Sequence, residues 1–142
     1  MYDESKHTQA YGYAVATSGG EGNVATVSWL PEGSNTVFTK GPTGKRLIIT
    51  DVMLNPQGDV RAAHTVNLAG KNPDGTHLIF FQFRVPPGAV VGAPRRRFIA
   101  TQQAHFLTGH VIWAGKEVIT FTDAKPPAGQ HISVALNAYL AT

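Results

Sequence analysis

Short apolar segments, each followed by residues that favour turns, recur along most of the chain. Gly, Pro, Asn and Asp interrupt the sequence too often to leave room for long helices. Short apolar runs bounded by such residues predict β-strands. The expected strands cover residues 24–30, 36–39, 46–54, 60–69, 77–85, 98–101, 106–113, 117–122 and 131–140.

Two of these segments indicate their own place in the fold. Residues 46–54 are apolar at nearly every position, which is typical of a central strand that is covered on both faces. Residues 77–85 alternate, so a strand there would pack one aromatic face against an opposing sheet. That face would carry His77, Ile79, Phe81, Phe83 and Val85.

The number and spacing of the segments predict the fold class. Eight or nine strands, separated by turns every 8 to 12 residues or so, fit an antiparallel sandwich better than a parallel sheet with crossover helices. Eight strands are the number of a jelly roll. We therefore predict an all-β, two-sheet antiparallel β-sandwich of jelly-roll type over residues 23–142. Residues 1–22, which are polar and Gly-rich, are expected to form an extended N-terminal arm.

Length and composition indicate the number of domains, the compartment of synthesis and the classes of partner to expect. A length of 142 residues suits one domain with a single core. The chain has no cysteine, and its first ten residues lack the charged and apolar regions of a signal peptide, so we expect synthesis in a reducing cytoplasm. No stretch reaches membrane-spanning length. The net charge of +3 does not by itself predict nucleic-acid binding.

The residues that could carry catalysis or bind a metal show no convergent pattern. The six histidines include no His-x-His or His-Glu-x-x-His arrangement, and the serines include no Gly-x-Ser-x-Gly motif. Among the carboxylates, Asp51 is unusual because it interrupts an apolar segment. We expect it to have a structural partner, such as a buried Arg or a backbone amide. The sequence therefore predicts a non-enzymatic protein without a cofactor or a bound metal.

Two features leave room for a binding function. Arg95, Arg96 and Arg97 could be a solvated loop or a docking patch for an acidic protein surface. Nucleic acid is the least favoured partner, because no aromatic residues interleave the arginines. A carbohydrate-binding module is the alternative function, but both tryptophans lie in apolar runs and are expected in the core. The aromatic candidates for such a module are Trp29, Trp113, Tyr11, Tyr13 and Tyr139.

A compact jelly roll with an extended arm, no cysteine and no secretion signal resembles the decoration, or cement, proteins on the heads of tailed bacteriophages. The resemblance is one of architecture over the whole chain. It implies a virion structural protein that binds the major capsid protein on the outer capsid surface as a dimer or trimer, with no membrane partner. The arm would add a strand to a neighbour's sheet or lie along the capsid, and arginines would supply charge complementarity. The residues so implied are Tyr2, Tyr11, Tyr13, Arg95, Arg96 and Arg97.

Overall fold

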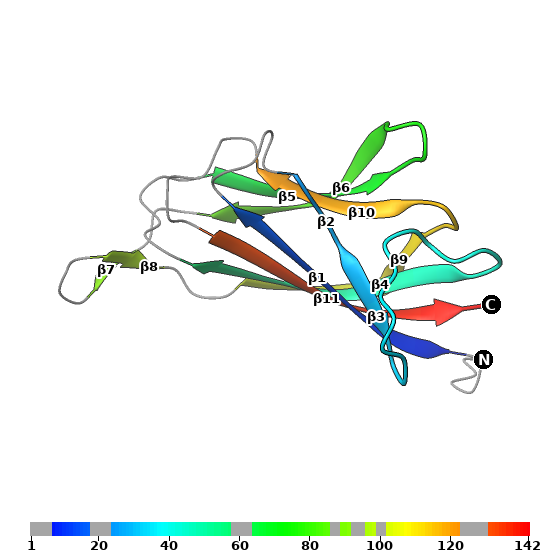
Figure 1. The fold of residues 1–142 in the computed structure, drawn as a ribbon. Coiled ribbons are helices and arrows are strands. Elements are labelled where there is room, and N and C mark those ends of the chain that lie inside the picture. Colours follow the sequence, from blue (N-terminus) through cyan, green and yellow to red (C-terminus); the bar gives the residue numbers. More distant parts are fainter. Residues whose placement is uncertain are drawn as a thin grey trace.

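The computed structural model describes residues 7–17, 24–57, 64–85, 89–91, 96–98, 102–122 and 131–142. Within these ranges every helix or strand assigned is a β-strand (Figure 1), so the predicted all-β class is confirmed. The strands are β1 (Thr8–Thr17), β2 (Ala25–Thr26), β3 (Ser28–Pro31), β4 (Arg46–Gln57), β5 (His64–Lys71), β6 (His77–Val85), β7 (Ala89–Val91), β8 (Arg96–Phe98), β9 (Gln102–Ile112), β10 (Glu117–Thr122) and β11 (His131–Ala141).

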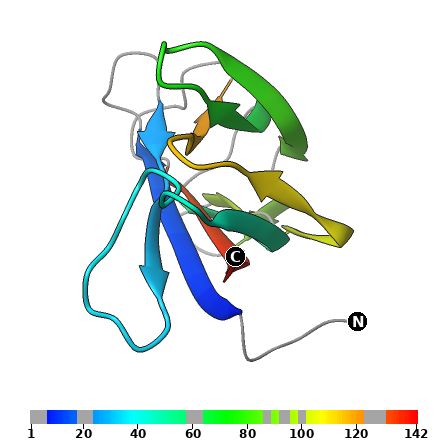
Figure 2. The same cartoon turned by 90° about the vertical axis from the view of Figure 1, so that its right-hand side faces the viewer.

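The strands form two antiparallel sheets that lie face to face, and a separate hairpin (Figures 1 and 2). The five-stranded sheet has the order β3-β1-β11-β4-β9, the four-stranded sheet has the order β2-β10-β5-β6, and β7 pairs with β8. β1 pairs with β11, β2 with β10, β4 with β9 and β5 with β6. If β3 and the hairpin are left aside, the first of these eight strands thus pairs with the last, the second with the second-last, and so on inward. This nested pairing is the wrapped hairpin of a jelly roll, which confirms the predicted fold.

The segment from β2 to β3 passes from one sheet to the other. β2 pairs with β10, whereas β3 pairs with β1 in the opposite sheet. Between them, the N–H of Val27 donates to the carbonyl oxygen of Val118 at 2.8 Å. The strand predicted over residues 24–30 is therefore present but changes sheet at Val27, and it leaves Trp29 fully buried at this corner of the core.

The hydrophobic core lies between the two sheets. β4 is flanked by β11 and β9, which confirms that residues 46–54 belong to an interior strand of the sheet. The expected covering of both faces is wrong, because Met53 on the outer face is 41% exposed. The β4 side chains Leu47, Ile49, Val52 and Leu54 are at most 1% exposed. Because the chain has no cysteine, burial of this kind is the main source of stability.

The structure differs from the prediction of an arm over residues 1–22. Thr8–Thr17 form β1, which pairs with β11 along its whole length and with β3 through Ala10–Tyr13. Its small residues face the core and its tyrosines face outward, so the pattern is that of a strand whose inward side chains are unusually small. β1 is therefore part of the five-stranded sheet, and it lies between two strands over Ala10–Tyr13. Residues 1–6 and 18–23 lie outside the described residues.

Two further expectations need correction. β6 has the predicted bounds, but its register with β5 shifts between Phe81 and Ile79, so Phe80 is an extra residue in a bulge. Beyond this bulge the expected aromatic face does not continue, and Ile79 is 40% exposed. Trp113, expected in the core, is 53% exposed because it follows the end of β9 at a turn.

Candidate functional site

A row of mainly exposed side chains crosses the outer face of the five-stranded sheet. The register pairs each member of this row with the next, and directly opposed residues point to the same face of a sheet. The row runs through β3, β1, β11, β4 and β9, and its members are Leu30, Tyr11, Asn137, Asp51 and His105. Sequence positions far apart are therefore brought together at one surface.

Asp51 and His105 form a polar pair at the β9 end of this row. The Nδ1 atom of His105 lies 2.7 Å from Oδ1 of Asp51, and the hydroxyl of Thr50 donates to Oδ2 at 2.9 Å. The hydrogen bond from His105 lowers the pKa of Asp51, and it outweighs the opposite effect of partial burial. The structural partner of Asp51 is thus a histidine and a threonine, not the buried arginine or backbone amide expected from the sequence.

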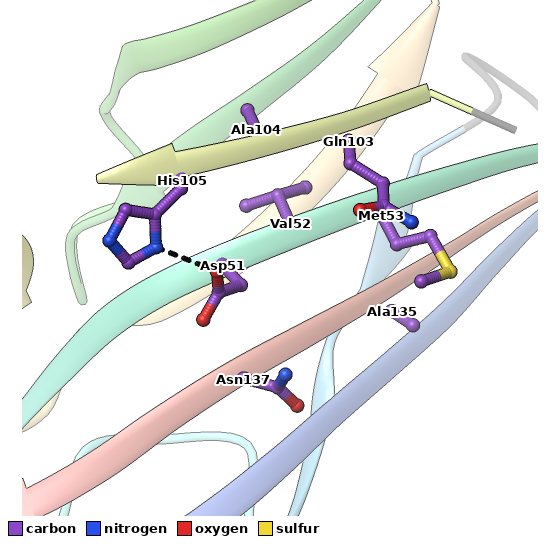
Figure 3. Close-up of a pocket in the computed structure, with 8 residues that line it drawn as sticks. All are labelled: Asp51, Val52, Met53, Gln103, Ala104, His105, Ala135 and Asn137. Carbon is purple, nitrogen blue, oxygen red and sulfur yellow. Dashed lines mark hydrogen bonds and ion pairs between the residues drawn. The ribbon is translucent and has the colours of Figure 1, made fainter. Parts of the chain in front are cut away.

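A first hollow of about 330 Å³ lies beside this pair. Figure 3 shows its polar side chains on three neighbouring strands, with Asp51 on β4 between His105 on β9 and Asn137 on β11. Met53, Gln103 and Ala135 line the other side of the hollow. The hollow therefore combines a carboxylate, two amides and an imidazole with the apolar side chains of Met53 and Ala135.

A second hollow of about 530 Å³ adjoins the first and shares Asp51 and Asn137 with it. It extends over β1 and β11 and is lined by Tyr11 and by Glu32 from the loop after β3. At its far side the His7 and Tyr139 rings stack with centroids 4.7 Å apart. We call the two hollows together the outer groove.

The structure places only some of the predicted partner-binding residues. Tyr11 and Tyr13 are exposed by 55% and 56% on the same face of β1, but Tyr13 lines neither hollow. Tyr2 and Arg95 lie outside the described residues. Arg96 and Arg97 belong to β8 of the hairpin, which projects from the end of the sandwich opposite to the labelled chain ends (Figure 1).

A second exposed surface lies where the edge strands β6 and β9 close one side of the sandwich. The Phe80 ring stacks on His110 with centroids 4.1 Å apart, and Phe81 meets Phe106 edge-on at 5.3 Å. Burial lowers the pKa of His110 in this cluster. On the same two strands, Leu107 of β9 is 91% exposed and Leu78 of β6 is 78% exposed. We call the surface formed by these side chains the open edge. It consists of Leu78, Phe80, Phe81, Phe106, Leu107 and His110.

A large irregularity in β9 exposes Leu107. Ile49 of β4 is opposite His110, whereas Asp51 is opposite His105, so four residues of β9 face Thr50 alone. The turn of this bulge uses Gly109, whose φ of 78° suits glycine. The same irregularity determines the register that places His105 beside Asp51.

Within the described ranges, no group of three or more His, Cys, Asp or Glu side chains could hold a metal ion. The same residues include no helix that is long and apolar enough to cross a membrane. Sequence reasoning singled out Asp51 but missed His105 and Asn137, because only strand register brings them together. The sequence signal that could have found them is a polar residue among apolar neighbours in each strand, as at Asp51 in β4 and Asn137 in β11.

Comparison with known proteins adds the following. No family model matches the chain, and no curated protein matches it. Structures that it resembles include two crystal structures of murine APRIL, at pH 8.5 and pH 8.0, with TM-scores of 0.36 and 0.34. Each is 14% identical in sequence, and each alignment covers 92% of this chain and 98% of the other. These likenesses do not bear on the function of this chain.

Proposed function

We propose that the protein is a non-enzymatic structural protein of a virion that self-associates through its open edge and decorates the outside of a phage head. The observation that carries the proposal is the exposure of Leu107 and Leu78, the two most exposed large hydrophobic side chains among the described residues. These leucines extend from the two strands whose rings Phe80, Phe81 and Phe106 contact one another, and exposed apolar patches mark interaction sites in soluble proteins.

The strands that carry these leucines support an interface with another chain. β6 and β9 each form one edge of their sheets, so each has one side without a strand partner in the described structure. Unpaired edges are surfaces on which a strand from another chain can add. The bulges in both strands make a side-chain interface at the open edge more favourable than a continuous sheet across it.

The charge of the open edge favours a second copy of the same chain. Among all residues of β6 and β9, Arg84 is the only Lys, Arg, Asp or Glu. A two-fold interface brings each patch against its own copy, so a strongly charged patch would repel itself. A nearly neutral, aromatic and aliphatic surface meets no such repulsion and has the composition of an interface core.

The capsid contact is proposed for the hairpin that lies between β6 and β9 in the chain. The hairpin of β7 and β8 projects from the end of the sandwich and carries Arg96 and Arg97 in its second strand (Figure 1). Arginine is the residue best suited to bind carboxylates in two-pronged contacts. An oligomer formed at the open edge would thus present several basic hairpins to the acidic surface of a major capsid protein.

Solution mass measurement tests the self-association. Wild-type protein should be a dimer by light scattering, and Leu107→Glu should shift it to a monomer. Val37→Glu is the matched control, since Val37 is 58% exposed in the loop after β3, where the next residue, Phe38, pairs with Trp29 of β3 and not with β6 or β9. A monomeric wild-type protein at all accessible concentrations, or equal dissociation by both variants, would contradict the interface.

Fractionation tests the virion assignment. Lysates of the cells that produce the protein should be separated on a density gradient, and the protein quantified in each fraction. We expect it to sediment with intact heads and to be released from them at high salt, because charge attraction is screened there. Recovery of the protein only among free soluble proteins would overturn the decoration function while leaving the oligomer intact.

A further inference from the structure

The outer groove presents both hydrogen-bond donors and hydrogen-bond acceptors. Each carboxylate oxygen of Asp51 has one partner and can accept a second hydrogen bond. His105 contacts Asp51 through Nδ1, so its Nε2 atom remains available to a ligand, and no described residue bonds to that atom. The side-chain amide of Asn137 also has no partner among the described residues, and it can both donate and accept.

These groups lie in a geometry suited to a ligand with several neighbouring hydroxyl groups. Asn137, Asp51 and His105 are consecutive along the row, and neighbouring strands lie about 4.8 Å apart. Figure 3 shows the three polar side chains on the same side of the sheet. A ring with adjacent hydroxyls could therefore bond to two or three of them at once.

An aromatic side chain flanks the polar groups. Tyr11 precedes Asn137 in the row, lines the second hollow and is 55% exposed. The face of an aromatic ring is an apolar surface with partial negative charge, and it attracts the C–H groups on the face of a sugar ring. The groove thus offers hydrogen bonds along one side of a flat polar ligand and an apolar contact beside them.

The charge of the lining restricts the ligand further. The formal charges are carboxylates, those of Asp51 and Glu32, and no Lys or Arg lines either hollow. An anionic ligand such as a sialylated or sulfated glycan would meet these carboxylates without a compensating cation. The groove therefore fits an uncharged polyhydroxylated ligand.

From these observations we propose that the outer groove binds a neutral oligosaccharide, with one sugar unit over Asn137, Asp51 and His105 and a neighbouring unit against Tyr11. This site is separate from the open edge and shares no lining residue with it. A decoration protein with such a groove could attach its particle to neutral glycans on a cell surface. The groove can be tested whether or not the virion assignment holds.

The first test is a titration with neutral tetrasaccharides built from glucose, N-acetylglucosamine, galactose or mannose, followed by amide NMR spectra of the ¹⁵N-labelled protein. At least one should shift the resonances of residues in both hollows with an affinity in the millimolar range or tighter. Sialylated and sulfated counterparts are included. Binding of the anionic glycans alone, or no shift with any saccharide, overturns the proposal.

Two pairs of variants assign the binding to these residues. Tyr11→Ala should weaken it roughly tenfold, whereas Tyr13→Ala, on the same face of β1 and equally exposed, should leave it unchanged. Asp51→Asn should weaken it roughly tenfold or more, whereas Asp74→Asn, in the exposed turn before β6, should not. Unchanged amide spectra in the absence of sugar verify folding. Equal losses in both members of a pair would place the saccharide elsewhere and overturn the site.

Discussion

Gly12 of β1 lies directly against the indole ring of Trp29, its register partner on β3. A Cβ atom at Gly12 would come within 2.7 Å of Cζ3 of that ring and 2.8 Å of Cγ1 of Val27. Because Trp29 is fully buried at the corner where the chain changes sheet, neither neighbour can move aside easily. The close approach of β1 to this corner therefore depends on the absence of a side chain at residue 12.

Gly12→Ala should lower the free energy of unfolding by about 1 to 3 kcal/mol, the usual cost of an extra group in a well-packed core. Gly70→Ala is the control, since its Cβ would make only an ordinary contact, 3.7 Å from Cδ1 of Ile112. That variant should be as stable as the wild type or more stable by up to about 1 kcal/mol, because alanine is less flexible than glycine when unfolded. Urea denaturation measures both, and equal effects would argue against the tight contact.

Gly109→Ala should destabilise the protein more than Gly33→Ala. Both glycines have left-handed backbone, with φ of 78° and 77°, so each substitution costs about 1 to 2 kcal/mol in backbone strain. Only at Gly109 would the added Cβ also overlap a neighbour, 2.5 Å from Cγ2 of Ile48, whereas nothing lies within 4 Å at Gly33. The difference between the two unfolding free energies measures the overlap. No difference would mean that the β9 bulge is not held against β4.

Removing the imidazole of His105 should raise the pKa of Asp51 towards its ordinary value of about 4, because the hydrogen bond from His105 is what lowers it most. The side-chain carboxyl carbon resonance of Asp51, followed by NMR in wild type and His105→Phe, checks this. Asp74, whose pKa is lowered by hydrogen bonds from Thr76, provides an internal control that should not change.

The lowered pKa of Asp51 also has a consequence for stability. A carboxylate with a depressed folded-state pKa contributes stability that is complete above its unfolded-state pKa, about 4, and is lost as the pH falls through the folded-state value. The difference in free energy of unfolding between the wild type and Asp51→Asn should therefore be smaller at strongly acidic pH than at neutral pH. A difference that stays constant down to strongly acidic pH would contradict the linkage.

His110 should make the protein less stable as the pH falls from 7 towards 5. Its pKa is lowered by burial, so the unfolded chain binds a proton more readily than the folded chain does. The resulting stability is complete above the ordinary histidine pKa of about 6.5 and is lost below it. His110→Phe, which can keep the stacking on Phe80, should remove this part of the pH dependence in urea denaturation. A His110 resonance that titrates above the ordinary value would contradict the assignment.

Strand positions were accessible from the sequence because they depend on local patterns. The prediction over residues 77–85 matches β6, and that over 117–122 matches β10. The N-terminal strand was missed because its inward positions hold Ala and Gly, which do not read as an apolar face. Only the position of Gly12 opposite the large Trp29 shows why a residue without a side chain belongs there.

Less of the candidate site than of the strands could be predicted, because the site depends on strand register and local patterns do not give the register. Asp51 was visible as a polar residue in an apolar segment, but its partner His105 is 54 positions away in the chain. The two meet because β9 inserts several residues between the partners of Ile49 and Asp51. A bulge of this kind shifts every later pair along the strand, and nothing in the alternation of β9 itself indicates it.

The sequence by itself determined that this chain forms short strands around one apolar core, because alternation and turn residues act over a few neighbouring positions. Which strand pairs with which was decided only by the tertiary structure, since pairing is chosen to bury all the apolar faces together. The same holds for the outer groove and the open edge. Each consists of residues from strands that are distant in the chain, and only the wrapped pairing of the jelly roll makes them neighbours.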